Sequence, residues 1–296
     1  MDLRLPTQLC IDRAQILKTA SSLGLVGAGA HSGPRIMAAL CNPLVSPGEV
    51  ESLVLREPAL YARVLRIANS PYYGQVRSIT TLSRAVVVLG LDAVRGIAAA
   101  ACLDRTLPRG RQHPLIDMTA VVHHSVATAA AAEALARIRH PELAAEAFIA
   151  GLLHNLGIVV QLSVDAPGVE AMIGLRAADD HRDMRILELE RALVGHEECI
   201  ATIFEEWQLP ESLVAATRDH HDPIAAPQIH RELTALVNLG ATLGLASGST
   251  FTLEPAASPR NLSAMECVGL DHEQLNAVAD DLPTRLATLR QALFDR

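Results

Sequence analysis

The chain has 296 residues, of which 50% are hydrophobic and only 3% aromatic. Its formal net charge is −8, from 25 basic and 33 acidic side chains. Proteins that bind duplex DNA usually present a basic surface, so DNA is not an expected partner. A sequence rich in alanine and leucine and poor in aromatic residues favours packed helices over sheets. Composition therefore predicts an all-α fold.

Five cysteines lie far apart and form no CxxC pair: Cys10, Cys41, Cys102, Cys199 and Cys267. Isolated cysteines are typical of buried thiols in a reducing cytoplasm. The longest continuous apolar run, Ile97–Leu103, is too short to span a bilayer, and no signal segment opens the chain. We therefore expect a cytoplasmic protein that makes no membrane contact.

Helix signals follow one another closely in the first third of the chain. Pro47 and Pro58 each suit the first position of a helix. Thr80 or Thr81 can cap the helix that comes next, and Gly90 suits its left-handed end. Together with the apolar spacing, these signals predict helices over residues 13–23, 35–41, 47–55, 58–68, 82–89 and 93–103.

The remaining helices are expected over residues 115–138, 144–156, 169–177, 182–194, 197–207, 211–220, 229–245, 272–282 and 283–294. Residues 107–113, with PRGRQHP at their core, are the most linker-like stretch. This boundary predicts three units. They are a helical bundle at 12–106, a second helical subdomain at 114–246, and a helical tail at 247–296 that packs on the second subdomain. The two subdomains are expected to pack together.

Several of the 12 histidines fall at helix ends or beside small residues of the second subdomain: His124, His154, His196, His220 and His221. Histidine is the commonest metal ligand, and helical bundles usually build such sites in their core. Each histidine alone is more typical of a hydrogen-bonded core or capping residue than of a metal ligand, and only the set favours a site. The pair His154-Asn155 is notable because it interrupts the apolar stretch 147–161, where burying polar groups costs free energy.

Two runs in the first subdomain carry a family resemblance. EPALYARVLRIANSPYYG at 57–74 and ITTLSRAVVVLGLDAVRGIA at 79–98 resemble the first half of an HDOD domain. HHSVATAAAAEALA, EAFIAGLLHNLG, GHEECIATIFEEWQLPE and HHDP, in this order, resemble its second half. That half is similar to the HD superfamily of metal-dependent phosphohydrolases, including the HD-GYP cyclic-dinucleotide phosphodiesterases. The resemblance covers about residues 16–245, which makes the second subdomain HD-like.

The resemblance also implies a set of site residues. His124 matches the first histidine of the superfamily pattern better than His123 does, and the later ones fall on His196, His220 and His221. The His-Asp pair falls on His154-Asn155, and the final aspartate falls on Asn238. Both carboxylates of the pattern are therefore amides in this chain. The GYP segment is also missing.

The loss of both carboxylates has a chemical consequence. In the catalytic pattern, an aspartate bridges two divalent ions, which lower the pKa of a bound water. A neutral amide oxygen cannot bridge two cations with comparable strength. We therefore expect no catalytic residue and no enzyme activity, and a vestigial pocket in which Asn155 hydrogen-bonds a neighbouring imidazole. No cofactor is expected. The alternative is one divalent ion held by the five histidines named above.

Taken together, the resemblance implies a bacterial, regulatory signal-transduction module that acts without catalysis. We expect contacts with signalling proteins, in a two-component or cyclic-di-GMP pathway, through the groove between the two subdomains. Two alternatives remain: a residual metal-dependent phosphohydrolase or phosphodiesterase, and a sensor that binds a nucleotide in the degenerate pocket. The sequence predicts no particular oligomeric state.

Overall fold

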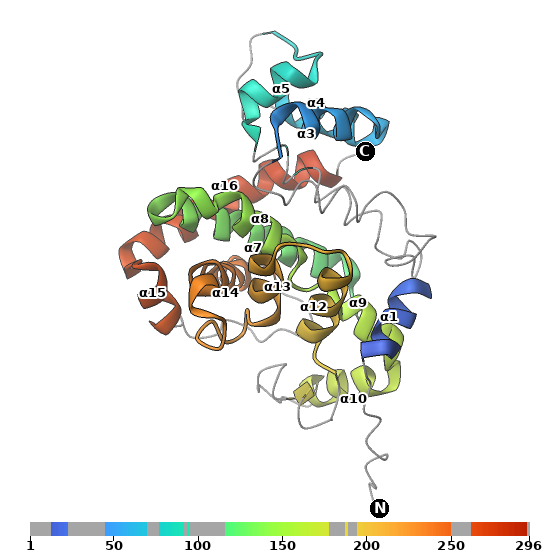
Figure 1. Ribbon diagram of the computed structural model, residues 1–296. Helices are drawn as coiled ribbons and strands as arrows, with labels where there is room; N and C mark the ends of the chain where they lie inside the picture. The colour runs from blue at the N-terminus through green and yellow to red at the C-terminus, as the bar shows by residue number, and fades with distance from the viewer. Residues whose placement is uncertain are drawn as a thin grey trace, which may run out of the picture.

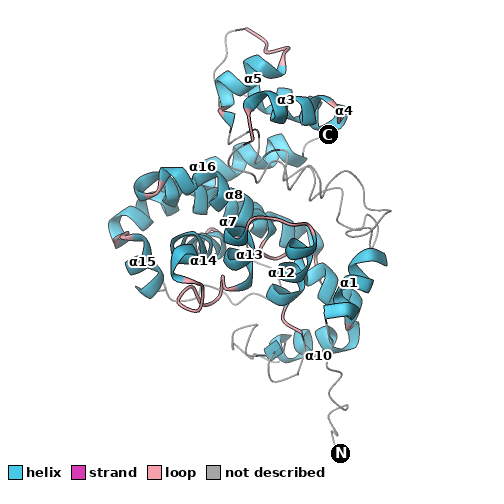
Figure 2. Ribbon diagram, in the orientation of Figure 1, coloured by secondary structure: helices cyan, strands magenta, loops and turns pink. Residues whose placement is uncertain are grey.

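The computed structural model describes residues 13–22, 45–69, 77–91, 94, 97, 116–177, 187–188, 194–249 and 262–294. Helices joined by turns make up these ranges, and no strand occurs within them (Figure 2). The predicted all-α fold is therefore confirmed. The helix expected at 35–41 lies outside the described residues. Those expected at 93–103 and 182–194 lie outside them too, apart from a few single positions.

Three short helices form the first group. They are α3 (Pro47–Leu55), α4 (Pro58–Ala68) and α5 (Leu82–Leu89), and all three contact one another (Figure 1). Thr81 caps α5 by accepting a hydrogen bond from the amide of Arg84, as the sequence suggested. Gly90 ends the same helix with a φ of +84°, a conformation that costs glycine little.

Asn69 explains part of the ANS motif that follows α4. Its Oδ1 accepts a hydrogen bond from the amide of Ile79 at 2.7 Å, and its Nδ2 donates to the carbonyls of Leu65 and Ile79 at 2.8 Å each. A single side chain thus ties the end of α4 to the segment that leads into α5. This asparagine has a structural role, because its side-chain amide is hydrogen-bonded to three backbone groups.

A second, larger group surrounds the long helix α7 (Met118–Arg139), which contacts α8, α14 and α16. Seven alanines of α7 are at most 6% exposed, and their small side chains allow the neighbouring helices to approach closely. The other members are α8 (Ala144–Leu153), α9 (Gly157–Val164), α10 (Ala166–Ala177), α12 (His196–Glu206), α13 (Glu211–Arg218) and α14 (Arg231–Ala246), with short 3₁₀ turns at Pro141–Leu143 and Gln228–His230.

The tail differs from the prediction. A helix that the sequence did not predict, α15 (Leu262–Val268), packs on α14. The expected helices at 272–282 and 283–294 are one continuous helix, α16 (His272–Phe294), with Pro283 inside it. Proline usually ends or bends a helix because it lacks an amide hydrogen and its ring crowds the preceding turn. Leu282 and Leu286, buried on either side of it, hold this helix against the core.

Helix α16 contacts helices of both groups. It contacts α7 in the second group and α4 in the first, and it lies between the two groups (Figure 1). One apolar cluster includes Ile67 of α4 and Leu282 of α16. Helix α16 therefore contacts both groups in the region where the sequence predicted a docking groove.

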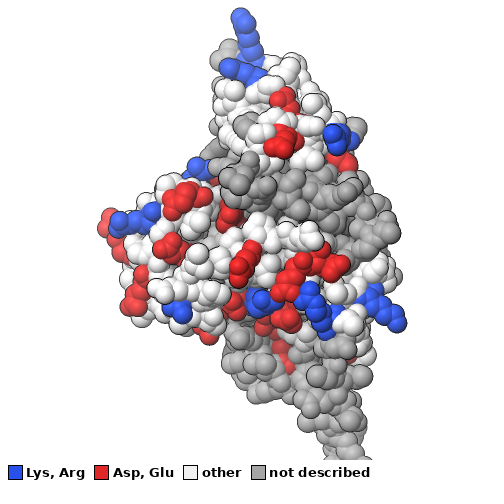
Figure 3. Space-filling view, in the orientation of Figure 1, with Lys and Arg blue, Asp and Glu red and all other residues white. Residues whose placement is uncertain are grey.

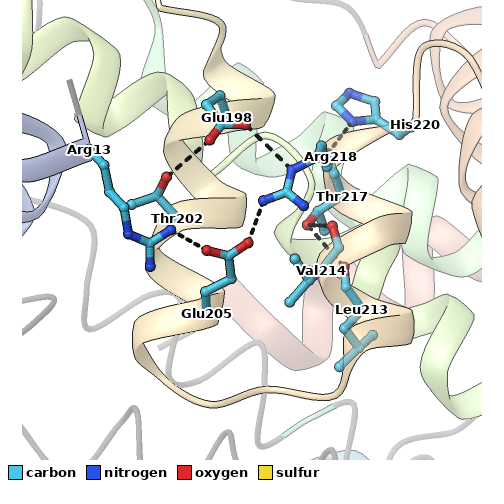
Figure 4. A network of polar contacts seen from close by, with 9 residues as sticks. All are labelled: Arg13, Glu198, Thr202, Glu205, Leu213, Val214, Thr217, Arg218 and His220. Carbon is cyan, nitrogen blue, oxygen red and sulfur yellow. Dashed lines mark hydrogen bonds and ion pairs between the residues drawn. The ribbon is translucent and has the colours of Figure 1, made fainter. Parts of the chain in front are cut away.

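Helix α1 (Arg13–Ser22) contacts α9 and α12, whereas the predicted boundary at residue 106 places it with the first bundle. Arg13 pairs with Glu205, which also accepts a 2.5 Å hydrogen bond from Arg218 (Figure 4). These hydrogen bonds lower the pKa of Glu205. By its packing, α1 belongs to the second group.

One segment, Pro141–Val164, is apolar and long enough to cross a membrane by length and composition, with a mean hydropathy of 1.8. In the structure it comprises α8, α9 and the turns before and between them. Its most apolar stretch of 18 residues is 83% buried inside the protein. Its apolar character is accounted for by its place in the core.

Candidate functional site

The His154-Asn155 pair lies in a turn, not inside a helix as the predicted helix 144–156 implied. Helix α8 ends at Leu153, and α9 begins at Gly157. Gly157 lies against the first turn of α12, since a Cβ atom placed on it would come within 1.8 Å of the carbonyl oxygen of His196. This close approach brings the turn next to the histidine that begins α12.

The structure brings the five predicted histidines together (four of them fully or almost fully buried). His124 comes from the middle of α7, His154 from the turn after α8, His196 from the start of α12, and His220 and His221 from the end of α13. Their ring centroids are 5.4 Å apart for His124–His154, 4.9 Å for His154–His220, 4.0 Å for His220–His221, 5.3 Å for His196–His220 and 5.1 Å for His196–His221.

Two of these rings are held in the same way. Nδ1–H of His154 donates to the carbonyl of Gly151 at 2.7 Å, and Nδ1–H of His220 donates to the carbonyl of Thr217 at 2.8 Å. Both carbonyls lie three residues earlier on the chain. The Nε2 atoms of both rings are buried and have no hydrogen-bonding partner among the described residues. Each therefore presents a lone pair to the pocket, the state in which imidazole binds a metal.

His124 differs from these two rings. Its Nδ1 lies 3.0 Å from the carbonyl oxygen of Ser249, and its Nε2 lies 3.3 Å from Oγ1 of Thr128. Both ring nitrogens are thus engaged by protein groups, and Ser249 ties the beginning of the tail to the pocket. This geometry is typical of a structural histidine.

Burial disfavours the protonated forms of His124, His154 and His220. It lowers the pKa of His124 to about 4, although the hydrogen bond to Ser249 acts in the opposite direction. It also lowers the pKa values of His154 and His220 well below the usual value, and neighbouring histidines lower them further. A protonated ring here would lose its hydration, and two protonated rings this close together would repel each other.

Sequence reasoning missed one residue of the site, Glu188. This carboxylate is 1% exposed, and its Oε1 lies 3.0 Å from Nδ1 of His196 and accepts a 2.6 Å hydrogen bond from Nε2 of Gln161. Burial alone would raise the pKa of Glu188, but its electrostatic interaction with His196 and its hydrogen bonds with His196 and Gln161 together lower it. The pocket therefore holds a buried carboxylate, supplied by a residue outside the superfamily pattern.

The two amides at the carboxylate positions behave differently from each other. Asn238 donates from Nδ2 to the carbonyl of His220 at 2.8 Å, which holds α14 against the end of α13. Asn155 is fully buried, and neither atom of its amide has a hydrogen-bonding partner among the described residues. The predicted hydrogen bond between Asn155 and a neighbouring imidazole is therefore wrong.

The residues of this pocket fit one kind of metal centre and not another. A two-ion hydrolytic centre does not fit, because neither Asn155 nor Asn238 can supply the bridging carboxylate. His196, His220 and His221 can each offer one ring nitrogen, and the three atoms lie within 4.8 Å of one another. Neutral imidazoles in such a group suit one divalent transition-metal ion.

A family model described as HDOD domain matches residues 31–223. The chain belongs to the HDOD domain family. The matched range includes α3, α4 and α5 of the first group and all five histidines of the pocket. The resemblance drawn from the sequence motifs is thus confirmed.

Over 205 residues the HDOD chain is 28% identical to an uncharacterized protein of Treponema pallidum strain Nichols, a match that covers 68% of this chain and 39% of that protein. It thus spans about two fifths of the length of the curated relative that it matches.

Solved structures share the fold. A provisionally named signal transduction protein of Marinobacter aquaeolei VT8 is 24% identical, with a TM-score of 0.76 over 99% of this chain and 67% of its own. An HDOD domain protein of unknown function from Geobacter sulfurreducens is 22% identical, with a TM-score of 0.71 over 96% of this chain and 100% of its own. A provisionally named phosphohydrolase of Shewanella amazonensis SB2B is 22% identical, with a TM-score of 0.69 over 95% of this chain and 98% of its own.

Proposed function

We propose that this HDOD chain is a non-catalytic module of bacterial signal transduction that acts by contacting other signalling proteins. The observation that carries the proposal is the pair of amides, Asn155 and Asn238, at the positions where a hydrolytic centre needs carboxylates. Similar folds bear names of both kinds, signal transduction protein and phosphohydrolase. The amides favour the first, because without a bridging carboxylate the site cannot hold two ions and activate water.

The surface supports a protein partner over DNA. On the face shown in Figure 3, acidic and basic side chains of the described residues are intermingled and form no extended basic surface. The chain as a whole carries a net charge of −8. Phosphate backbones are bound mainly through clustered lysine and arginine, so this distribution fits a protein or peptide better.

Affinity purification of the tagged chain from its native cells, followed by mass spectrometry, tests this function. We expect signalling proteins to co-purify, and we expect the purified chain to leave cyclic dinucleotides intact in the presence of Mn²⁺ or Fe²⁺. Turnover that scales with the chain and disappears in His154→Ala would contradict a non-catalytic role. Thermal shifts with a nucleotide panel test the sensor alternative, because a ligand that binds only the folded state raises the melting temperature.

Restoring both carboxylates is expected to increase metal uptake. In Asn155→Asp with Asn238→Asp, one buried and one half-buried position gain negative charge beside the histidines, which gives a second ion the bridging ligands that it needs. We expect about two equivalents of Mn²⁺ or Fe²⁺ per chain in the double variant, against at most one in the original chain. Elemental analysis after gel filtration measures the ratio. Equal metal content in the two proteins would mean that the amides are not what prevents a two-ion site.

A further inference from the structure

We propose that the surface formed by α9 and α12 recognises a short basic amphipathic helix, that α1 occupies this surface within the chain, and that a helix of a signalling partner with the same pattern displaces α1. The nature of the partner rests on the proposed function, whereas the surface itself does not. Two kinds of observation support the surface: the way in which α1 is seated on it, and the charges on both sides of the contact.

Helix α1 is held by few buried side chains. Of its ten residues, Ile16 and Ala20 are buried, at 2% and 0% exposed, and both belong to the apolar cluster that contains Ile203 of α12. Most of its other side chains are exposed. An isolated helix shorter than about 12 residues is only marginally stable in water. Helix α1 is therefore expected to stay helical mainly while it is docked.

The contact face of α1 combines a small apolar stripe with positive charge. Arg13, Ile16 and Ala20 lie three and four residues apart, which places them on one face of the helix. Helix α1 carries Arg13 and Lys18 and no acidic residue, whereas α12 carries four glutamates and no lysine or arginine. Arg13 pairs with one of these, Glu205 (Figure 4). Such charge complementarity selects a basic helix for this surface.

Arg218 of α13 holds Glu205 in position from the other side. Nη2 of Arg218 donates to Oε1 of Glu205 at 2.5 Å, while Oε2 of the same carboxylate pairs with Arg13 (Figure 4). Nε of Arg218 also lies 3.4 Å from Oε2 of Glu198. Because these contacts do not involve α1, they can hold the carboxylate when α1 leaves. A group that is already ordered loses less entropy when a ligand binds.

The fit of α1 on α9 is incomplete. A hollow of about 520 Å³ remains beside the contact, and Lys18, Thr19, Ser22, Ser163 and Val164 are among the residues that line it. Protein interiors are usually packed without gaps of this size. A helix with larger side chains at the positions of Thr19 and Ser22 could therefore bury more surface than α1 does, which would allow it to compete.

The limits of the family match separate α1 from the surface that it covers. The HDOD match begins at residue 31, so it includes α9 and α12 but not α1. The surface thus belongs to the matched domain, while its occupant does not. This division fits a domain surface that can receive helices from different sources.

The test measures the binding of a fluorescent synthetic peptide of residues 11–25 to the full chain by anisotropy. Ile16→Asp places a charge in the buried contact and is expected to release α1. The peptide should bind this variant at least about tenfold more tightly than the original chain, where the tethered α1 competes at a high effective concentration. Ser21→Asp adds the same charge at an exposed position of α1 and is the matched control, which should behave as the original chain does.

The ionic part of the recognition is tested in the Ile16→Asp background. Adding Glu205→Gln removes the charge that receives Arg13, and we expect roughly tenfold weaker peptide binding. Glu211→Gln, an exposed carboxylate on α13, is the matched control and should have no effect. Binding should also weaken at about 1 M salt, because the Debye length falls to about 3 Å and these side chains are partly exposed.

Hydrogen exchange measured by mass spectrometry gives an independent readout of α1. The amides of residues 13–22 should exchange faster in Ile16→Asp than in the original chain or in Ser21→Asp, because an undocked α1 loses its helical hydrogen bonds. Circular dichroism checks that each variant is folded. Arg13→Glu, at a side chain that is 50% exposed, provides the released chain if Ile16→Asp does not fold.

Three results would overturn the proposal. They are a folded Ile16→Asp chain that does not bind the peptide, an original chain that binds it equally tightly, and equal protection of α1 in both. A dimeric original chain that becomes monomeric in Ile16→Asp would place α1 on a second copy, which contradicts occupation within the chain.

The partner is tested with the signalling proteins that co-purify with the chain. We expect the peptide to release them from Ile16→Asp, and we expect more of them to bind this variant than the original chain. Partners that bind both chains equally and are not released by the peptide would overturn the displacement of α1 and leave the proposed function intact. Peptide binding without any signalling partner would support the surface and count against the proposed function alone.

Discussion

Gly157→Ala is expected to lower the free energy of unfolding by about 3 kcal/mol or more, because overpacking a well-filled interior usually costs 1–3 kcal/mol and here the obstacle is backbone. A Cβ atom on this residue would lie 1.8 Å from the carbonyl oxygen of His196 and 3.1 Å from the amide of Ile200. Neither atom belongs to a side chain that could rotate away. Helices α9 and α12 must therefore separate, which moves His196 from Glu188.

Gly174→Ala is the matched control for this experiment. Gly174 lies in helix α10, and a Cβ atom placed there would meet nothing within 4 Å. We expect this variant to be more stable by about 0.5–1 kcal/mol, because alanine loses less backbone entropy than glycine in a helix. Urea titrations followed by far-UV circular dichroism measure both variants. A Gly157→Ala protein within 1 kcal/mol of the original chain would show that α9 and α12 are less closely packed than the structure indicates.

The protein is expected to lose stability steeply in mild acid when a chelator keeps it free of metal. His124 has its pKa lowered to about 4 by burial, and those of His154 and His220 are also lowered well below the usual value. In the unfolded chain, histidine takes up a proton below about pH 6.5. The unfolded state therefore binds more protons than the folded state as the pH falls through this range. Stability is fully present above pH 6.5 and declines below it.

The free energy of unfolding is expected to fall by about 1.4 kcal/mol per pH unit for each such histidine. For His124 the whole loss is about 3 kcal/mol. Glu188 acts at lower pH, because a carboxylate with a lowered pKa loses its contribution only as the pH falls below its ordinary value. Urea titrations between about pH 7 and pH 5 test the slope. In His124→Gln the slope should fall by about one proton. An unchanged slope in this variant, or stability that is constant over the range, would contradict the neutral buried state of His124.

The helices that could be predicted are those whose ends are set by residues at the ends themselves. Thr81 and Gly90 mark the two ends of α5 through a cap and a left-handed residue, both of which depend on local chemistry. Pro283 is a local signal that misled, because burial of Leu282 and Leu286 against the core outweighs its cost in α16. The position of α1 against α9 and α12 depends on packing between distant segments, for which the sequence gives no local sign.

For the site, too, local motifs could be read from the sequence, whereas contacts between distant segments could not. The histidines could be named because they fall in recognisable motifs, but their roles depend on hydrogen bonds that only the structure shows. Ser249 and Thr128 occupy both nitrogens of His124, whereas Nε2 of His220 is left without a partner among the described residues. Glu188 lies eight residues before His196 and outside any motif. A single glutamate in the otherwise apolar stretch ILEL was the one sign that could have pointed to it.

The contact between α16 and α4 has a consequence for how the protein is made. Residues 58–68 leave the ribosome long before residues 272–294, yet they share one apolar cluster. A nascent chain that already contains α3, α4 and α5 must therefore wait for residues 272–294 before this contact with α4 can form. Such contacts between distant segments slow folding and leave apolar surface open to aggregation meanwhile. For this chain, a helix that is translated much later than α3, α4 and α5 takes part in the packing of the first group.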